Sequence, residues 1–188
     1  MSGGHYRYFF TEHFGLPDAF YEDKRILDVG CGPRGSLEWA TMARQRVGLD
    51  PLVRAYAEFG IDRHDMSYVE GGAEAIPFPD HHFDVVSSIN SLDHVDDIPR
   101  AVAELTRVLA HDGTLLLICE VGHPATATEP QEFGFEILDA FVPPLVPIDV
   151  SRLRFIPEAG VLGSCLAKEP LPGDQAHGIL SARLAQNT

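Results

Sequence analysis

A glycine-rich turn after a short apolar run is the stretch whose residue types and spacing can do chemistry. Residues 26–29 are typical of a buried strand, and Gly30, Gly32 and Gly35 follow with the spacing Gly-x-Gly-x-x-Gly. Glycines let the backbone bend sharply and let a ligand approach closely, and the N–H groups of such a turn bind polar ligands. The spacing is typical of dinucleotide sites, although alone it also fits an ordinary strand-to-helix turn.

Asp28 changes the ligand that this turn favours. Its carboxylate lies two residues before the first glycine, where it repels a pyrophosphate and attracts a cation, by a few kcal/mol at most in a partly screened cleft. S-adenosylmethionine (SAM) carries an ammonium and a sulfonium and no phosphate. We therefore expect SAM at this turn, with the backbone N–H of Cys31 contributing, and keep an NAD-dependent oxidoreductase as the alternative.

The residues around the turn predict the elements that position it. Apolar and β-branched runs indicate further strands over residues 46–50, 66–69, 83–89 and 114–121, then within 160–168 and near 178–185. Helices are expected over residues 36–44, 51–59, 98–109 and 133–141, the third of them capped by Asp96 or Asp97 and ended by a left-handed Gly113. The alternation predicts an α/β fold: a doubly wound, Rossmann-like, mostly parallel seven-stranded sheet with helices on both faces.

The chain is interpreted as a single domain over residues 1–188. Aromatic residues crowd residues 1–25, which we expect either to pack on the sheet as one or two helices or to form a lid over the ligand. Residues 122–188 are expected to supply the variable substrate side and the last strands.

Polar residues follow the strands where an α/β sheet gathers its ligands. Asp50 ends the second strand at the interval of about 20 residues beyond the glycine motif at which an acid binds ribose hydroxyls; a helix N-cap before Pro51 has the same geometry. Asn90 and Ser91 follow the next buried strand. Because ligands bind outside the carboxyl ends of parallel strands, these residues are expected in one cleft.

Composition excludes several partners. The net charge of −14 disfavours nucleic acids and anionic membranes. Three cysteines without metal-type spacing predict free thiols in a reducing compartment. The sequence shows neither a run of about 20 apolar residues nor the pattern of a signal peptide, so a cytoplasmic protein is expected.

Several segments together resemble class I SAM-dependent methyltransferases, over about residues 24–121. The segments are Leu-Asp-Val-Gly-Cys-Gly-Pro from residue 27, the acid at residue 50, Ala-Glu-Ala-Ile-Pro-Phe from residue 73, Asn-Ser-Leu-Asp-His from residue 90, and Arg-Val-Leu-x-x-x-Gly-Thr-Leu from residue 107. The resemblance implies SAM as cofactor and S-adenosylhomocysteine as product. It implies a cofactor site made by Asp28, Gly30, Cys31, Gly32, Asp50, Pro51, Ala73, Glu74, Asn90 and Ser91.

One position departs from the family pattern. The family segment Gly-Asp-Ala-Glu wraps the adenine, and its Asp accepts a hydrogen bond from the adenine amino group; here that position is Gly72. The backbone N–H of Ala73 remains available for this contact.

The resemblance also implies the reaction and its catalytic residues. The sulfonium already activates the methyl group, so the protein mainly aligns nucleophile, carbon and sulfur. A hydroxyl nucleophile also needs a base, for which the imidazoles of His94 and His123 are suited, with Asp93 orienting His94. No bound metal is expected, although a metal-assisted O-methyltransferase using Asp93, His94, His123 and Glu129 is an alternative with suitable ligand types.

A looser similarity links three segments to bacterial methyltransferases of cell-surface glycan synthesis: residues 35–39, Asn-Ser-Leu-Asp-His from residue 90, and His-Pro-x-Thr-x-Thr-Glu-Pro from residue 123. It implies a small-molecule or sugar acceptor. The remaining alternative is a non-catalytic subunit with the methyltransferase fold, and the acceptor, the methylated atom type and the oligomeric state stay open.

Overall fold

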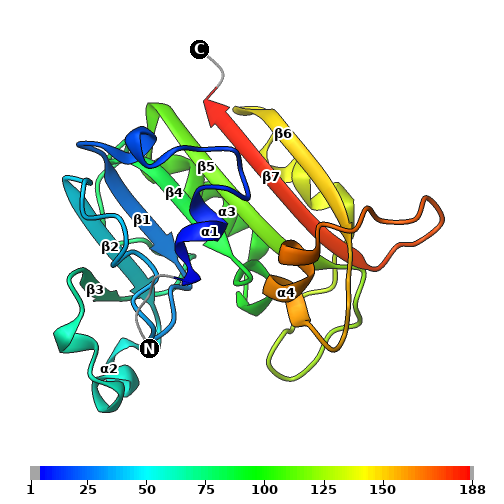
Figure 1. Cartoon of the computed structure of the whole chain (residues 1–188), viewed down its shortest axis with the longest axis horizontal. Helices are drawn as coiled ribbons and strands as arrows, with labels where there is room; N and C mark the ends of the chain where they lie inside the picture. Colours follow the sequence, from blue (N-terminus) through cyan, green and yellow to red (C-terminus); the bar gives the residue numbers. More distant parts are fainter. Residues whose placement is uncertain (1–4, 187–188) are drawn as a thin grey trace.

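A single seven-stranded sheet forms the centre of the computed structural model, which describes residues 5–186 (Figure 1). Its strands, in the spatial order β3-β2-β1-β4-β5-β7-β6, are β1 (Arg25–Val29), β2 (Gln45–Asp50), β3 (Ser67–Glu70), β4 (Phe83–Ile89), β5 (Leu109–Val121), β6 (Leu145–Arg154) and β7 (Gly178–Gln186). The first five pair in parallel, and β7 runs antiparallel to both of its neighbours. The predicted mostly parallel α/β sheet is confirmed.

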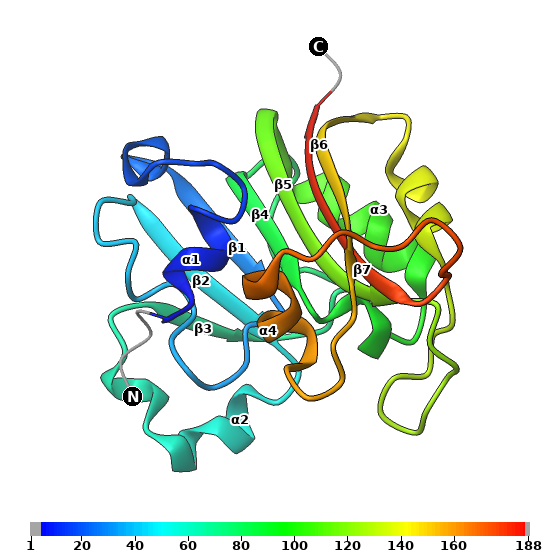
Figure 2. The same cartoon turned by 45° about the vertical axis from the view of Figure 1, so that its right-hand side comes forward.

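Helices cover both faces of this sheet, as predicted. The α-helices are α1 (Arg7–Phe10), α2 (Val53–Tyr56), α3 (Ile98–Val108) and α4 (Gly160–Ala167). Short 3-10 helices occupy Asp18–Tyr21, Ala57–Phe59, Ile61–Arg63, Leu92–His94 and Phe135–Phe141. Figures 1 and 2 show α3 behind the sheet and α1 and α4 in front of it.

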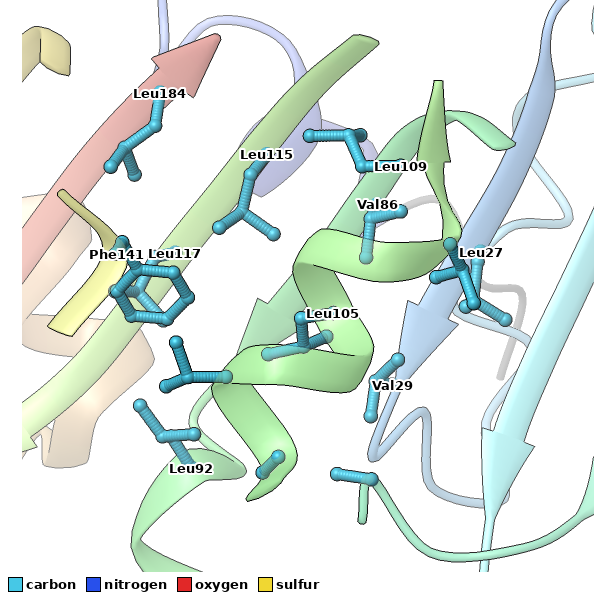
Figure 3. Close-up of a cluster of buried hydrophobic side chains, with 14 of the residues drawn as sticks. Leu27, Val29, Val86, Leu92, Leu105, Leu109, Leu115, Leu117, Phe141 and Leu184 are labelled. Carbon is cyan, nitrogen blue, oxygen red and sulfur yellow. The ribbon is translucent and has the colours of Figure 1, made fainter. Parts of the chain in front are cut away.

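Alternating side chains of the central strands divide the core between the two faces. Leu27 of β1 and Val86 of β4 pack against Leu105 of α3 (Figure 3), whereas Ile26 and Val85, one residue earlier on each strand, belong to the cluster on the opposite face. Successive strand residues point to opposite faces, so each strand anchors a layer on either side. The central strands are therefore buried and hold the ends of β1 and β4 rigidly.

Helix α3 follows the predicted apolar spacing. Its buried residues are Ala101, Val102, Leu105 and Val108. Asp97 caps it by accepting a hydrogen bond from the Arg100 N–H at 3.0 Å, and Pro99 lies in its first turn, as expected. The C-terminal end differs: β5 begins at Leu109, so Gly113 lies within that strand and is not a helix cap. The apolar side chains from Leu109 onward continue the sheet instead of the helix.

The sheet's topology creates a crevice beside β1. The chain leaves β1 toward β2 and β3, then crosses to the other side to form β4 and β5. Val29 pairs with Leu49 of β2 and with Ser88 of β4, so the carboxyl ends of these strands are level. At such a switch point the connections diverge and leave room for a ligand.

The helix predicted over residues 36–44 is not formed; the stretch is a series of turns. Turn-type hydrogen bonds replace the helical ladder, for example from Glu38 N to the Gly35 oxygen at 3.1 Å. The Ser36 hydroxyl instead donates to Asp28 at 2.5 Å, and the Arg44 N–H bonds to the Lys24 oxygen at 2.9 Å. These contacts hold the segment flat against the sheet while it returns to the start of β2.

Two predictions for the C-terminal part are wrong. Residues 160–167 form helix α4 where a strand was expected, with Val161, Ser164 and Cys165 buried at helical spacing. Strand β6 was missed because Pro147 lies inside it; β6 pairs only with β7 at the sheet edge, where a proline is tolerated. The predicted strand near 178–185 is confirmed as β7.

The described part of the N-terminal segment packs on the sheet, which was one of its two predicted roles. Phe9, Phe10, Phe14 and Tyr21 are buried in the cluster on the α1 face. Residues 1–4 of the predicted lid lie outside the described residues. Among residues 5–186, no helix combines the length and apolar character needed to cross a membrane.

Candidate functional site

A cavity of about 570 Å³ opens at the carboxyl ends of β1, β2 and β4. It lies at the switch point of the sheet, where α/β folds bind ligands. Its wall includes nine of the residues selected from the sequence: Gly30, Gly32, Asp50, Pro51, Ala73, Glu74, Asn90, Ser91 and His94. Leu52, Tyr56, Ser88 and Val95 also line it and were not predicted, because their residue types carry no motif signal.

Gly30 is required at the bottom of this cavity. Its φ of +75° is a left-handed conformation, and a Cβ at this position would overlap the Cβ of Ser91. Ser91 in turn donates its hydroxyl to the Val29 carbonyl oxygen at 2.7 Å. The end of β1 and the start of the segment after β4 are therefore locked together, and only glycine fits between them.

Asp50 lies at the end of β2 with both carboxylate oxygens in use. Oδ2 accepts from the Gly32 N–H at 3.1 Å, and Oδ1 accepts from the Leu52 N–H at 2.9 Å and the Tyr56 hydroxyl at 3.0 Å. The contact with Gly32 joins the glycine turn to β2. The contact with Leu52 fastens the turn before α2, but Leu52 is the N-cap of that helix, so Asp50 is not the helix N-cap that was the alternative. Asp50 lines the cavity, where a ligand can reach it.

Asp28 is placed beneath the glycine turn and outside the residues that line the cavity. Its carboxylate accepts hydrogen bonds from Ser36 Oγ at 2.5 Å and Ser87 Oγ at 2.7 Å. Burial raises the pKa of this carboxyl to about 6, against the lowering effect of the two serines. Asp28 therefore braces the turn from below, and its charge acts on a ligand only through the turn.

The backbone N–H of Cys31 was expected to contribute to the ligand site, but it is already bonded to another strand. That N–H donates to the Leu49 carbonyl oxygen at 3.3 Å, and the thiol is buried. Burial and the nearby carboxylates raise the pKa of the thiol, which disfavours the thiolate form that a nucleophile needs. The N–H groups of Gly30 and Cys31 both donate to the Leu49 carbonyl oxygen of β2. The sequence could not predict this, because it does not show how β1 and β2 are aligned.

Glu74 places a carboxylate oxygen next to Gly72, the position where the family pattern has an acid. A Cβ on Gly72 would lie 2.8 Å from Glu74 Oε2, and both residues line the cavity. The other oxygen, Oε1, accepts from the Asp96 N–H at 2.7 Å. A carboxylate is thus held at this part of the cavity wall although the family's Asp is absent.

Asn90 provides an unused acceptor. It adopts a left-handed φ of +55°, while its N–H donates to the Ile118 oxygen at 2.7 Å. Its side-chain oxygen is buried and has no hydrogen-bond partner within residues 5–186. A buried acceptor without a donor costs about 1–3 kcal/mol. Because Asn90 lines the cavity, turning its amide toward a donor group of a bound ligand would remove this cost.

The three predicted catalytic residues meet beside the cavity. His94 Nε2 lies 3.8 Å from Asp93 Oδ1, and His123 Nε2 lies 3.9 Å from Asp93 Oδ2. Asp93 is only 1% exposed, and burial raises the pKa of its carboxyl. His94 lines the cavity and its side chain is 43% exposed, whereas the His123 side chain is 10% exposed and is not part of the lining.

Backbone carbonyls orient both imidazoles. His94 Nδ1 lies 2.7 Å from the Thr128 oxygen, and His123 Nδ1 lies 3.0 Å from the Pro124 oxygen. Because a carbonyl only accepts, each Nδ1 carries the hydrogen and each neutral ring has its lone pair on Nε2. Both Nε2 atoms therefore face Asp93 as bases or as metal ligands.

The loop after β5 is fastened to this cluster by Gln131, which the sequence did not single out. Its Nε2 donates to the Val95 oxygen at 2.9 Å and to the Asp96 oxygen at 3.1 Å. Together with the His94 contact to Thr128, these bonds hold residues 123–131 beside the cavity. No sequence motif marks such a residue, because its partners are backbone atoms far away in the chain.

Comparison with known proteins agrees with this geometry. Residues 27–117, just under half of the chain, match the family model described as a methyltransferase domain. YcgJ of Bacillus subtilis strain 168, described as an uncharacterized methyltransferase, is 30% identical over 102 residues, which cover 51% of this chain and 40% of YcgJ. A demethylmenaquinone methyltransferase of Thermobifida fusca is 36% identical over 129 residues, covering 65% of this chain and 54% of the relative. The matches thus span about half the length of these relatives or less.

Solved structures extend the similarity to the whole fold. The crystal structure of YcgJ superposes with a TM-score of 0.62 at 19% identity, over 93% of this chain and 95% of YcgJ. The geranyl diphosphate C-methyltransferase of Streptomyces coelicolor A3(2) superposes with a TM-score of 0.68 at 18% identity, over 98% of this chain and 78% of that enzyme. The protein has the class I SAM-dependent methyltransferase fold. Residues 27–117 match the methyltransferase domain, and the predicted resemblance is confirmed.

Proposed function

We propose that this chain is a SAM-dependent methyltransferase that binds SAM in the cavity at the ends of β1, β2 and β4. The observation that carries the proposal is the lining of that cavity: the glycine turn, Asp50 and Glu74 from separate strands or loops, and the unpartnered oxygen of Asn90. Two carboxylates and a free amide oxygen suit a ligand that is cationic and rich in donors. The methyltransferase domain match over residues 27–117 supports the same reading.

Each polar group has a partner on the cofactor in this proposal. Asp50 accepts from the ribose hydroxyls, as acids at the end of the second strand do in related folds. Glu74 accepts from the adenine amino group in place of the absent Asp at residue 72. Asn90 Oδ1 accepts from the ammonium of the methionine part, since it lies nearer the β4 end of the cavity wall. The N–H of Ala73 is also in reach of the adenine side.

The reaction that we propose is O-methylation of a small-molecule or sugar acceptor, with an imidazole as base. His94 stands on the cavity wall with its Nε2 lone pair free, and that of His123, outside the lining, is free as well. Loss of the hydroxyl proton to Nε2 accompanies attack of the oxygen on the methyl carbon, and the electrons of the broken carbon–sulfur bond stay on sulfur, which leaves S-adenosylhomocysteine. Asp93 stabilises the resulting imidazolium from 3.8–3.9 Å.

Calorimetry tests the cofactor. SAM and S-adenosylhomocysteine should each bind at one site, and NADH should give no heat. Asp50→Asn should weaken both by about 10-fold or more, because charge-assisted hydrogen bonds to a diol contribute about 1.5–3 kcal/mol. Asp65→Asn is a matched control, since Asp65 is an exposed acid whose side chain pairs with Arg46 outside the cavity wall. Tight NADH binding without SAM binding would overturn the assignment.

Turnover tests the base. With labelled SAM and a panel of sugar and small hydroxylated acceptors, His94→Gln and His123→Gln are compared with the parent protein. A general base contributes about 10²–10⁴-fold, so one or both variants should lose at least 100-fold in kcat while the Kd for SAM changes little. Full turnover in both variants on an accepted substrate contradicts a histidine base. Cofactor binding without any methyl transfer to the panel favours the non-catalytic subunit instead.

A further inference from the structure

Asp93, His94 and Glu129 form a cluster whose ligand-type atoms converge on one point. One atom from each, two carboxylate oxygens and an imidazole nitrogen, lie within 4.8 Å of one another. Asp93 and His94 come from the turn after β4, and Glu129 comes from the loop after β5. The two segments are far apart in the sequence and are brought together by the hydrogen bonds of Gln131 and Thr128.

A second observation, independent of the clustering, points to an absent ligand. Asp93 Oδ1 is buried and has no hydrogen-bond partner in the part of the chain that the structure describes. It nevertheless faces His94 Nε2 at 3.8 Å, a distance at which neither atom satisfies the other. A buried carboxylate oxygen left without a donor is costly, and a cation between it and the imidazole would remove that cost.

The geometry suits a cation of ordinary size. Ligand atoms bound to one ion at about 2.0–2.2 Å are at most about 4.4 Å apart, and the 3.8 Å between Asp93 Oδ1 and His94 Nε2 is already within this limit. Glu129 lies on a partly exposed loop, so its carboxylate can move inward. The exposed side of His94 leaves a path for the ion and positions for water or substrate.

The imidazole is also prepared as a ligand. Histidines that bind metals commonly donate their other ring N–H to a carbonyl or carboxylate. His94 does so through Nδ1 to the Thr128 oxygen at 2.7 Å, which leaves Nε2 unprotonated and aimed at the cluster. His123 follows the same pattern next to the second oxygen of Asp93, where it can hold that oxygen in place.

We propose that Asp93, His94 and Glu129 bind one divalent first-row transition-metal ion beside the SAM cavity. One imidazole and two carboxylates are a mixed nitrogen and oxygen set, which suits Mn²⁺, Fe²⁺, Co²⁺ or Zn²⁺ better than the oxygen-preferring Mg²⁺ and Ca²⁺. The two carboxylates balance the charge of the ion. The sequence alone led us to expect no metal, because it did not show that Glu129 reaches the turn after β4.

This site goes beyond the proposed methyl transfer, since the ion would bind without SAM. Where both hold, His94 Nε2 is occupied by the ion and His123 is the remaining base. A bound divalent ion lowers the pKa of a hydroxyl that coordinates it. The proposed acceptors are therefore molecules whose hydroxyl, alone or with a neighbouring oxygen, can coordinate a metal ion.

To test the proposal, chelator-treated protein is titrated with Mn²⁺ in the absence of SAM. Binding is measured in two ways, by the loss of the electron paramagnetic resonance signal of free Mn²⁺ and by calorimetry. One Mn²⁺ per chain is expected. Asp93→Asn and Glu129→Gln, each nearly unchanged in shape, should weaken binding at least 10-fold. Glu132→Gln is the matched control, since Glu132 is an exposed acid in the same loop and outside the cluster. A melting curve for each variant excludes unfolding as the cause.

Two outcomes would overturn the proposal. One is the absence of stoichiometric binding up to millimolar Mn²⁺, repeated with Zn²⁺. The other is binding that all three variants retain equally, which would reflect diffuse attraction to a chain of net charge −14. SAM binding is measured separately in the presence of chelator, so a failure of the metal site and a failure of the cofactor site are read from different titrations.

Discussion

The regions that flank the cavity on its two sides differ in how completely their polar groups are bonded. On the side of β1 and β2, the carboxylate of Asp28 accepts from two serines and that of Asp50 from three donors. On the side of the loop after β5, Asp93 lies 3.8–3.9 Å from two imidazoles and one of its oxygens has no partner in the described chain. The first side is complete without a ligand, and the second is not.

This difference separates the parts of the site by function. A rigid, fully bonded turn presents a fixed shape to a ligand and has little to gain from rearranging. An oriented but unsatisfied cluster gains free energy from a cation, a proton or a substrate hydroxyl. We therefore assign recognition of the cofactor to the first side and chemistry on the acceptor to the second.

The largest effect is expected from Gly30→Ala, which breaks the complete side. The new Cβ meets Ser91 and forces a left-handed φ on alanine, for a combined cost of about 3–5 kcal/mol. Melting should fall by about 10 °C, at about 2–4 °C per kcal/mol for a chain of this size, and SAM binding should be lost in calorimetry.

Gly15→Ala is the matched control for that variant. Gly15 has a similar φ of +66°, but a Cβ there would meet no atom within 4 Å. This variant should lose only the free energy of unfolding that comes from the left-handed backbone, about 1–2 kcal/mol, and should keep its affinity for SAM. Equal losses in the two variants would show that the contact between Gly30 and Ser91 is unimportant.

Asp28→Asn tests the charge beneath the turn and should increase stability. The folded pKa of about 6 lies above the unfolded value of about 3.9. Between these values the folded state binds more protons, so the unfolding free energy falls as pH rises and the full cost is present above pH 6. Asparagine has no such cost, while the two serine hydroxyls can reorient to bond with it.

The expected gain is about 3 kcal/mol at pH 8 and about half of that at pH 5, measured by urea denaturation at both values. SAM affinity should fall in the same variant, because the negative charge under the turn is gone. A gain that is equal at both pH values, or a variant that binds SAM as tightly as the parent, would show that the Asp28 charge does not serve the ligand.

Much of the complete side was predictable because its residues follow strand ends. Once β1 and β2 are recognised as parallel neighbours, Gly30 and Asp50 must share one edge. What the sequence could not show is where a side chain turns for its hydrogen bonds. Asp28 was expected at the ligand, but hydrogen bonds from Ser36 and Ser87 hold its carboxylate beneath the turn. The bond from Ser36 also helps to explain why residues 36–44 form turns and not the expected helix.

The incomplete side was harder to predict because it depends on contacts between distant segments. Asp93 and His94 are adjacent in the sequence, and neighbours often point apart; a single 3-10 turn over Leu92–His94 directs both toward one point. The approach of Glu129 depends on Gln131 and on the length of β5. Neither feature has a periodic or motif signal.

Gln131→Ala should have the smallest effect and act mainly on the incomplete side. It removes a part-buried hydrogen bond to the Val95 carbonyl and an exposed one to the Asp96 carbonyl, for about 1 kcal/mol. Because both carbonyls can turn to water, global stability should change little. Amide hydrogen exchange in residues 122–131 should accelerate about 5-fold, and Mn²⁺ affinity should fall by a similar factor, as the loop that carries Glu129 is released. SAM affinity should change less than Mn²⁺ affinity, since Gln131 itself is absent from the cavity wall and reaches it only through the carbonyls of Val95 and Asp96. Glu132→Gln again serves as the control in the same loop.

If Gln131→Ala weakens the binding of SAM as much as the binding of Mn²⁺, the two sides of the cavity are one cooperative unit. The separation of cofactor recognition from chemistry on the acceptor is then wrong.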